Sequence, residues 1–516
     1  MVWLSSSALS QAQAPNTNSG SLPSLGESSD LSVLKERRIG DRIAVSVYRD
    51  PDYVDDPVLV DYVQGIWQPL MAAARARGEL NAELDERFAW EMFLVRDRSV
   101  NAFALPGGYF GLHLGLIGTV SNVDELAAVL GHELTHVTQR HIARLMTQQS
   151  RQTPLVIAAM ILGVLAAGKN AEVGNAAIVG GQAALAQNQL NFSRDMEREA
   201  DRIGFGVMTD AGFESRGVAS MFEKLQQASR LNDNGAFPYL RSHPLNTQRI
   251  AEAQSRVQLA ASEAPQPTAQ KELAQSQSRV LHAMMAARAR VLAAPGVDGL
   301  RSMLAEAQRR PLPLAAPQTP ASADNVRDVG TLYAAALASM QLRDFAGART
   351  FMGALRPFAV GVPRASDALD LLAIEIDLQA GTPAALASSA RFASASNRAE
   401  VLVLARALLA SQRAPEVSGK LQTWVTANPR DAQAWQLLAT AYGNQGQAVR
   451  AIRAEAESRA AQLDYPAALD RLKAAQAMMR SNPASADFVE GSIIDTRARQ
   501  LESLIKEQAL QEKVDR

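Results

Sequence analysis

Residues 131–136 read Gly-His-Glu-Leu-Thr-His and contain the pattern His-Glu-x-x-His, from His132 to His136. On an α-helix, positions i and i+4 lie about 40° apart, so both imidazoles can reach one point beside the helix. Glu133 lies next to that point, where its carboxylate can take a proton from a metal-bound water. The surrounding apolar residues have helical spacing: Leu126, Val129, Leu130, Leu134 and Val137. The stretch predicts a zinc-binding helix, and the alternative is a surface helix with two coincidental histidines.

A zinc site usually needs a third protein ligand. His141 lies five residues after His136, points about 140° away on a continuous helix, and is expected to face solvent. A better source is SRDMEREADR, residues 193–202, in which Glu197 and Asp201 share one helix face. Glu197 can bind the metal while Asp201 orients a ligand imidazole. A solvated charged helix face is the alternative on spacing alone.

The composition of the chain limits its architecture and its chemistry. With 516 residues, of which 47% are hydrophobic and 20% charged, the chain is expected to form two or three globular domains. The net charge of −1 argues against nucleic acid as the main partner. The absence of cysteine excludes disulfides and thiolate zinc sites, so any transition metal depends on histidine and carboxylate ligands.

Two segments bear on targeting. Residues 1–30 contain Ala12-x-Ala14, which is similar to a signal-peptidase site, but the preceding apolar stretch is short and lacks a basic start. A truncated signal and a disordered Ser-rich N-terminus therefore both stay open. The apolar run 155–168 is shorter than the ~20 residues that span a bilayer. Core packing, a lid over a site and contact with a membrane face stay open for it.

The periodicity divides the rest of the chain into three zones. Residues 31–256 mix strand-like and helical patterns, and we expect them to form one domain. Residues 257–270 gain Pro and Gln and are expected to be a linker. Residues 271–516 are Ala/Leu-rich and helical, with a Pro-rich interruption at 310–320. The predicted fold is mainly α with a small β-sheet: an α+β domain followed by an all-α solenoid.

The helical zone contains a recurring frame of large and small apolar residues. Its fullest copy is Trp435-x2-Leu-Ala-x2-Tyr442. The four copies start at Tyr333, Leu369, Val401 and Trp435, so that successive starts are 36, 32 and 34 residues apart. These spacings are close to the 34-residue period of tetratricopeptide repeats. The frame predicts stacked helix pairs with a protein-binding concave surface. A generic helical bundle is the alternative.

The two metal motifs together resemble a known family. His-Glu-x-x-His followed by Glu-x3-Asp, at Glu197 and Asp201, is similar to the gluzincin metalloproteases that include HtpX and the CAAX prenyl endopeptidases. The upstream stretch NAFALPGG, residues 101–108, resembles the edge strand and loop of that family, along which an extended substrate pairs. By resemblance, Asn101, Ala102 and Phe103 would contact substrate.

The resemblance also assigns roles at the site. It implies that His132, His136 and Glu197 bind one zinc ion, that Glu133 is the catalytic base, and that Asp201 orients a ligand. SHPLNTQRI, residues 242–250, matches a further motif of the family. There His243 would be a fourth zinc ligand that displaces the catalytic water and keeps the enzyme latent. Transition-state stabilisation by His243 and Arg249 is the other role.

A soluble gluzincin domain followed by tetratricopeptide repeats resembles the periplasmic members of this family that act in outer-membrane β-barrel assembly. The resemblance implies a zinc endopeptidase in quality control, with unfolded or misassembled proteins as substrates and the β-barrel assembly machinery as partner. Peripheral membrane contact through 155–168 stays open. The competing hypothesis is a repeat-based chaperone or adaptor with a vestigial zinc site. His113 and His282 have no partner by spacing and are expected to be structural.

Overall fold

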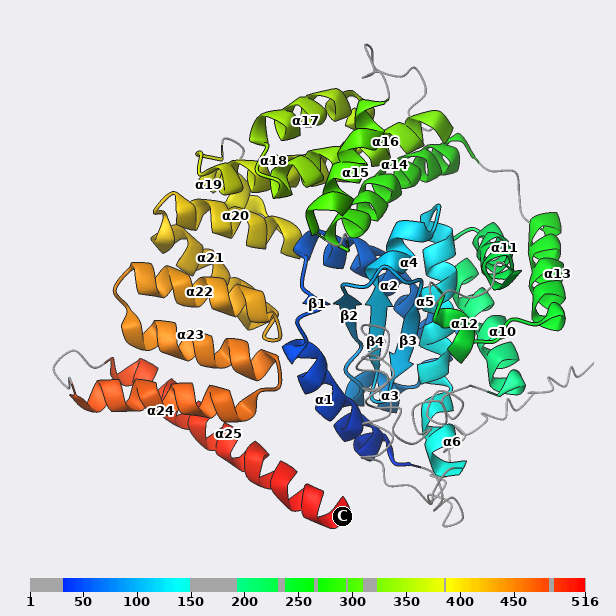
Figure 1. Cartoon of the computed structure of the whole chain (residues 1–516). Helices are drawn as coiled ribbons and strands as arrows, with labels where there is room; N and C mark the ends of the chain where they lie inside the picture. Colours follow the sequence, from blue (N-terminus) through cyan, green and yellow to red (C-terminus); the bar gives the residue numbers. More distant parts are fainter. Residues whose placement is uncertain are drawn as a thin grey trace, which may run out of the picture.

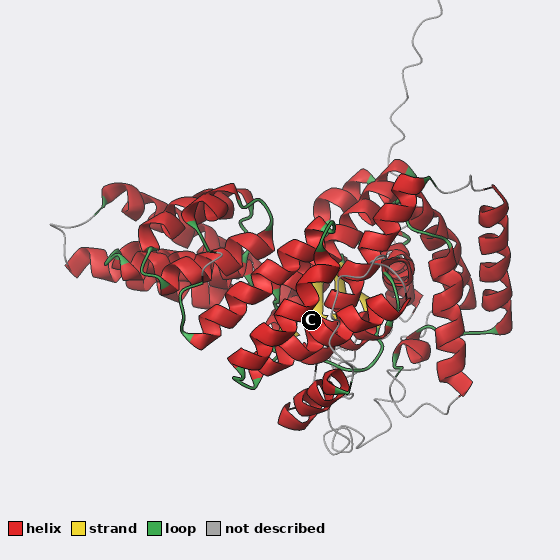
Figure 2. Cartoon of the chain, turned by 90° about the horizontal axis from the view of Figure 1, so that it is seen from above, coloured by secondary structure: helices red, strands yellow, loops and turns green. Residues whose placement is uncertain are grey.

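The computed structural model describes residues 31–148, 193–230, 237–263, 268–293, 296–309, 323–384, 387–481 and 487–515. Among these residues, helices predominate and surround one small sheet (Figures 1 and 2). The predicted fold class, mainly α with a small β-sheet, is confirmed. The N-terminal segment 1–30, the apolar run 155–168 and the Pro-rich stretch 310–320 lie outside the described residues.

The sheet has four strands in the order β1-β2-β4-β3. Their bounds are Tyr53–Val54 for β1, Glu91–Val95 for β2, Ala102–Leu105 for β3 and Tyr109–His113 for β4. β2 and β4 run parallel, while the outer pairs β1–β2 and β3–β4 are antiparallel. Gly107 and Gly108 join β3 to β4 with φ of 76° and 80°, a conformation that glycine adopts without strain. The sheet therefore has β3 at one edge.

The helices around the sheet come from two stretches of sequence, one before and one after the undescribed residues 149–192. They are α1 (Val33–Arg49), α2 (Pro57–Ala76), α3 (Ala82–Arg87), α4 (Leu114–Thr119), α5 (Val123–Thr138), α6 (His141–Gln148), α10 (Arg194–Asp210), α11 (Arg216–Arg230), α12 (Tyr239–Ser242) and α13 (Thr247–Glu263). α5 packs against β3 on one side and against α10 and α11 on the other. The metal motifs therefore lie beside the β3 edge of the sheet.

The C-terminal helices form an arc that begins above the sheet, where the first of them packs against α4, and continues round its β1 side (Figure 1). They are α14 (Ala269–Leu292), α15 (Gly296–Gln308), α16 (Ala323–Gln341), α17 (Phe345–Ala359), α18 (Pro363–Ala380), α19 (Ser389–Ser394), α20 (Arg398–Ala410), α21 (Ala414–Ala427), α22 (Ala432–Asn444), α23 (Ala448–Ala461), α24 (Tyr465–Ser481) and α25 (Phe488–Asp515). Helix occupies both ends of the stretch expected as a linker, because α13 reaches Glu263 and α14 begins at Ala269.

Each start of the recurring frame falls on a helix of this arc: Tyr333 on α16, Leu369 on α18, Val401 on α20 and Trp435 on α22. α16, α20 and α22 each pack against the helix that follows in the chain. The small residue of the frame is buried at Ala405 and Ala439, where a larger side chain would separate the paired helices. The helical pattern is thus confirmed, and the assignment to tetratricopeptide repeats stays a prediction.

The arc is held against the sheet region by ion pairs that are buried or partly buried. Arg288 on α14 contacts Asp56, at the start of α2, at 2.7 Å and Glu375 on α18 at 2.7 Å. Arg398 on α20 donates two hydrogen bonds to Asp55, of 2.7 and 2.9 Å. One hydrophobic cluster also runs from the sheet region into the arc. The two parts of the chain therefore share a core.

None of the described helices is both long and apolar enough to cross a membrane.

Candidate zinc site

The metal motifs are brought together by the packing of α5 against α10. Asn122 caps the start of α5 by accepting a hydrogen bond from the backbone of Glu125, as a helix N-cap does. The helices cross where Gly131 faces Gly204. A Cβ atom built on Gly204 would lie 3.0 Å from the backbone of Gly131. Because neither residue has a side chain, the two backbones approach closely enough for Glu197 on α10 to reach both histidines on α5.

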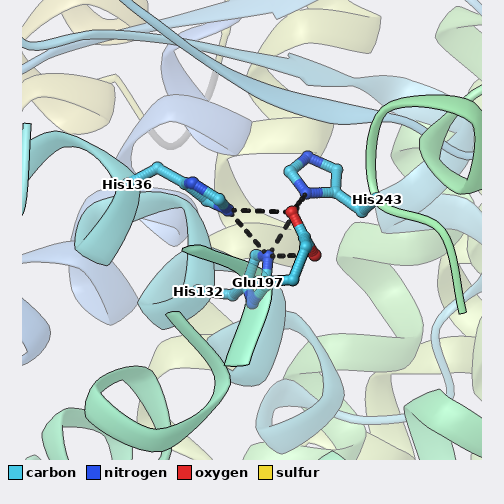
Figure 3. Close-up of side chains that lie close together, drawn as sticks. All are labelled: His132, His136, Glu197 and His243. Atoms are coloured by element: carbon cyan, nitrogen blue, oxygen red, sulfur yellow. Dashed lines mark hydrogen bonds and ion pairs between the residues drawn. The ribbon is translucent and has the colours of Figure 1, made fainter. Parts of the chain in front are cut away.

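Four predicted residues converge on one point, as Figure 3 shows: His132, His136, Glu197 and His243. Their side chains are buried, with at most 6% of each residue exposed. From His132 Nε2, the distances are 3.0 Å to His136 Nε2, 3.5 Å to Glu197 Oε2 and 3.3 Å to His243 Nδ1. Glu197 Oε1 lies 3.5 Å from His136 Nε2 and 2.9 Å from His243 Nδ1.

These separations fit a tetrahedral zinc ion. Ligand atoms about 2.1 Å from a metal centre lie about 3.4 Å from one another at tetrahedral angles. The donor set of three imidazoles and one carboxylate is also typical of zinc, and no cysteine is needed for it. The residues present therefore fit the metal that the motifs predict.

The atoms of the cluster that face away from its centre are held by further side chains. His132 Nδ1 lies 3.0 Å from Asp201 Oδ1, the carboxylate that the sequence predicted to orient a ligand. Arg249 donates two hydrogen bonds to Asp201, of 2.7 and 2.8 Å, and its Nη1 lies 2.8 Å from Glu197 Oε2. One guanidinium thus contacts both Glu197 and Asp201 on α10.

Glu133 lies beside the cluster, and its side chain is buried. Its Oε1 is 3.3 Å from His243 Nε2, so the histidine at the fourth position also faces the predicted base. Tyr239, on the short helix α12, stacks against the His243 ring with centroids 4.6 Å apart. Sequence reasoning missed Tyr239. Its position four residues before His243 was the available signal, because residues four apart lie on the same face of a helix.

Burial and neighbouring charges shift the titration of the site. Burial disfavours the charged form of His132, yet its interactions with Asp201 and Glu197 raise its pKa to about 10. Burial lowers the pKa of His136 well below its usual range, with the charge of His132 adding to the effect. For Glu197 burial is opposed by His243 and His132, which together hold its pKa well below the usual range. At neutral pH these shifts give a carboxylate at Glu197, a neutral imidazole at His136 and a proton on His132, which a bound metal ion would displace.

His141 does not face solvent, and that prediction is wrong. The residue is fully buried, and its Nδ1 lies 2.9 Å from His136 Nδ1. The angle of 140° assumed one continuous helix, but α5 ends at Thr138 and Arg140 has a left-handed φ of 54°. The turn redirects the chain so that His141 packs behind the predicted ligand.

The other two histidines lie away from the cluster. His282 is buried between Tyr62 Oη, at 2.6 Å, and the carbonyl of Val120, at 2.9 Å. His113 lies 2.9 Å from Ser99 Oγ. These contacts are consistent with the structural roles expected for the two residues.

The predicted substrate segment forms β3, with Asn101 directly before it. β3 pairs with β4 on one side, and no other described strand pairs with its outer edge. Phe103 lies over Gly111 of β4, where a Cβ atom would come within 2.0 Å of its ring. An unpaired strand edge offers backbone groups to which an extended peptide can pair.

Comparison with known proteins identifies relatives. The model of peptidase family M48 matches residues 63–257. The chain is 30% identical to the beta-barrel assembly-enhancing protease of Yersinia pestis over 85% of its own length and 83% of that protein. It is 36% identical to the putative beta-barrel assembly-enhancing protease of Vibrio cholerae, where the match spans 46% of this chain and about half, 47%, of the relative.

A more distant relative is the mitochondrial metalloendopeptidase OMA1 of Arabidopsis thaliana, with 32% identity over 32% of this chain and 31% of that protein. These matches confirm the resemblance that the two metal motifs indicated.

Proposed function

Because the chain belongs to peptidase family M48, a family of zinc metalloproteases, we propose that it is a zinc-dependent endopeptidase whose metal is held by the four-residue cluster. His132, His136 and Glu197 are the permanent ligands, and His243 is the fourth. The observation that supports this assignment is the set of ligand-atom separations of 2.9 to 3.5 Å among buried side chains, with Glu133 beside them.

The chemistry follows from the surroundings of each group. A bound zinc ion lowers the pKa of a coordinated water toward ~7 and polarises the scissile carbonyl. Glu133 takes the proton of the attacking water and delivers it to the leaving amine. Asp201 Oδ1 lies 3.0 Å from His132 Nδ1. This contact holds the imidazole in the tautomer that directs its other nitrogen, Nε2, to the cluster. Arg249 orients Glu197 and Asp201, and this contact favours a ligand-orienting role over direct transition-state stabilisation.

Substrate binds as an added strand along the outer edge of β3. Asn101, Ala102 and Phe103 lie at the start of that edge, and α5 packs against the same strand. Backbone pairing depends weakly on side chains, so the enzyme accepts many extended segments. This broad acceptance of extended segments suits substrates that have failed to fold.

The enzyme is latent while His243 occupies the fourth position. A zinc ion with four protein ligands has no open position for the attacking water. In addition, His243 Nε2 lies 3.3 Å from Glu133 Oε1, where the proton of that water would be taken. Activation requires His243 to move away from the cluster. Tyr239 and α12 would move with it, because the backbone N–H of His243 bonds to the carbonyl of Tyr239.

The biological role is inferred from the relatives. Two of them are named beta-barrel assembly-enhancing proteases, so we place this enzyme in the bacterial envelope, in the periplasm, acting on misassembled outer-membrane β-barrel proteins. The β-barrel assembly machinery is the corresponding partner, and contact of 155–168 with a membrane face belongs to the same proposal. Residues 31–256 form the protease domain, 257–270 the linker and 271–516 the tetratricopeptide domain.

The test compares the latent and released enzyme on an unfolded polypeptide such as casein, with the full chain loaded with zinc. His243→Ala opens a metal position and frees Glu133, so cleavage is expected to rise at least severalfold over wild type. The double variant with Glu133→Gln is the control and is expected to abolish cleavage. A His243→Ala protein that binds zinc and cleaves no faster than wild type would contradict latency.

The second candidate is a repeat-based chaperone or adaptor. The arc of helix pairs α16 to α23 favours it, because such arrays bind proteins. Glu133→Gln separates the two functions: an endopeptidase loses substrate turnover, whereas a binding module keeps full activity in a β-barrel assembly assay.

A further inference from the structure

The predicted zinc ligand His136 is backed by a second buried histidine. His141 Nδ1 lies 2.9 Å from His136 Nδ1, and the ring centroids are 4.9 Å apart in an edge-on arrangement. Two nitrogens at this distance share one hydrogen. When Nε2 of His136 faces the cluster as an acceptor, its Nδ1 carries the hydrogen and donates it to His141.

The other nitrogen of His141 completes a chain to the protein surface. Its Nε2 lies 2.9 Å from Glu199 Oε2, and because Nδ1 accepts, Nε2 carries the hydrogen and donates. Arg144 contacts the same carboxylate oxygen at 3.2 Å and also donates to the carbonyl of Gln139. Glu199 and Arg144 are partly exposed, with 31% and 41% of their side chains accessible, whereas His141 is fully buried.

The chain keeps His141 in place through an unusual turn. Arg140 adopts φ of 54°, a left-handed conformation that is costly for a residue with a side chain. Its guanidinium offsets this cost by binding Glu36, which is buried, at 3.1 Å, and the carbonyl of Leu31. A contact 104 residues away in sequence thus aims His141 at His136.

We propose that His141 is a positioning residue that fixes the tautomer and ring orientation of the zinc ligand His136. Both proposed zinc ligands on α5 are then oriented by a carboxylate, one directly and one through an intervening imidazole. His132 bonds directly to the carboxylate of Asp201, whereas His136 reaches the carboxylate of Glu199 through one further imidazole. Partners of this kind typically change metal affinity 10- to 100-fold when they are removed. The inference rests on the proposed metal role of His136.

The experiment measures zinc affinity of the full chain by competition with a chromogenic chelator. His141→Leu fills the space but cannot accept the hydrogen of His136, so its affinity is expected to fall 10- to 100-fold. His141→Asn places an amide oxygen close to the position of Nδ1, and we expect it to recover at least half of that loss on a logarithmic scale. His282→Asn, at a buried histidine outside the cluster, is the control and should bind zinc within about twofold of wild type.

A second readout is the visible spectrum of the cobalt-loaded protein, which reports ligand geometry without turnover. We expect His141→Leu to change the band positions and His282→Asn to leave them unchanged. If His141→Leu does not fold, Glu199→Leu replaces it. That variant removes the outer carboxylate at a partly exposed position, and its affinity is expected to fall severalfold.

The outcomes distinguish this inference from the proposed function. If wild type binds no zinc, the proposed metal site fails and the inference fails with it. If wild type binds zinc but His141→Leu, or Glu199→Leu in its place, binds it equally well and gives the wild-type cobalt spectrum, only the positioning role of His141 is overturned. Equal losses in the leucine and asparagine variants also contradict the role, because a hydrogen-bond acceptor would then not matter.

Discussion

Replacing Arg249 by methionine tests whether this residue holds the site together. Arg249 is 4% exposed and contacts Asp201 with two hydrogen bonds and Glu197 at 2.8 Å. Methionine keeps most of the volume but leaves both carboxylates, which are 7% and 2% exposed, without their cation. Removing one partner of a buried ion pair costs about 3–5 kcal/mol.

The expected loss for this protein is near the lower end of that range, about 3 kcal/mol. Asp201 keeps its contact with His132, and Glu197 keeps its contacts with the histidines, so neither carboxylate is left without any partner. For a cooperative unit of 150–250 residues, this loss lowers the melting temperature by roughly 6–12 °C. The free energy of unfolding is measured by urea unfolding of the full chain, monitored by circular dichroism.

Two further variants make the test specific. Arg256→Met, on the same helix α13, removes a partly exposed pair with Glu252 and is expected to cost less than about 1 kcal/mol. Asp201→Asn combined with Arg249→Met also removes the carboxylate that has lost its guanidinium partner. The double variant is therefore expected to recover about 1–2 kcal/mol.

A direct transition-state role for Arg249 predicts a different result. Arg249→Met would then reduce turnover while the free energy of unfolding stayed within about 1 kcal/mol of wild type. That result would refute the ligand-orienting role derived from the contacts with Asp201 and Glu197.

Two further predictions concern the crossing of α5 with α10 and the junction with the helical arc. Gly204→Val places a branched side chain against the backbone of Gly131, at most 3.0 Å away, so it should separate the helices, destabilise the protein by about 1–3 kcal/mol and weaken zinc binding. Zinc titration and urea unfolding check this, and unchanged zinc affinity would contradict it. Burial raises the pKa of Glu91, in the cavity between β2 and α20, to about 7. Because the folded state then binds a proton that the unfolded chain releases above about pH 4.5, stability is lost as pH rises through 4.5–7. Glu91→Gln should therefore be more stable than wild type by roughly 1–3 kcal/mol at pH 8 and equal to it near pH 4.5. If urea unfolding gives the same stability difference between Glu91→Gln and wild type at pH 8 and at pH 4.5, the raised pKa of Glu91 is contradicted.

The cluster was partly predictable because two of its ligands form a local helical pair. His132 and His136 follow the i, i+4 rule within one helix, so local spacing predicted them. Glu197 and Asp201 share a helix face by the same rule, but spacing left a solvated charged face open, and the resemblance to the family decided their roles. His243 lies in a short turn after α12, and only resemblance to the family indicated it.

The role of His141 could not be predicted from spacing. Its direction depends on the left-handed turn at Arg140, which is stabilised by Glu36 from α1. A contact between residues more than 100 positions apart leaves no local pattern in the sequence. The junction between Arg398 and Asp55, 343 residues apart, escaped prediction for the same reason.

The helix ends beside the predicted linker could not be located from the sequence for a different reason. Pro and Gln in 257–270 suggested a break, but residues 257–263 continue α13 and α14 begins at Ala269. Alanine and leucine favour helix strongly enough to extend it up to the prolines. Composition averaged over a window therefore does not locate the ends of these helices.

The most direct test of the central claim is a crystal structure of the zinc-loaded protein with anomalous data collected at the zinc edge. We expect one ion bound by Nε2 of His132 and His136, a carboxylate oxygen of Glu197 and Nδ1 of His243, at about 2.0–2.2 Å. An anomalous peak elsewhere, or none at this cluster in protein that retains zinc, would contradict the account.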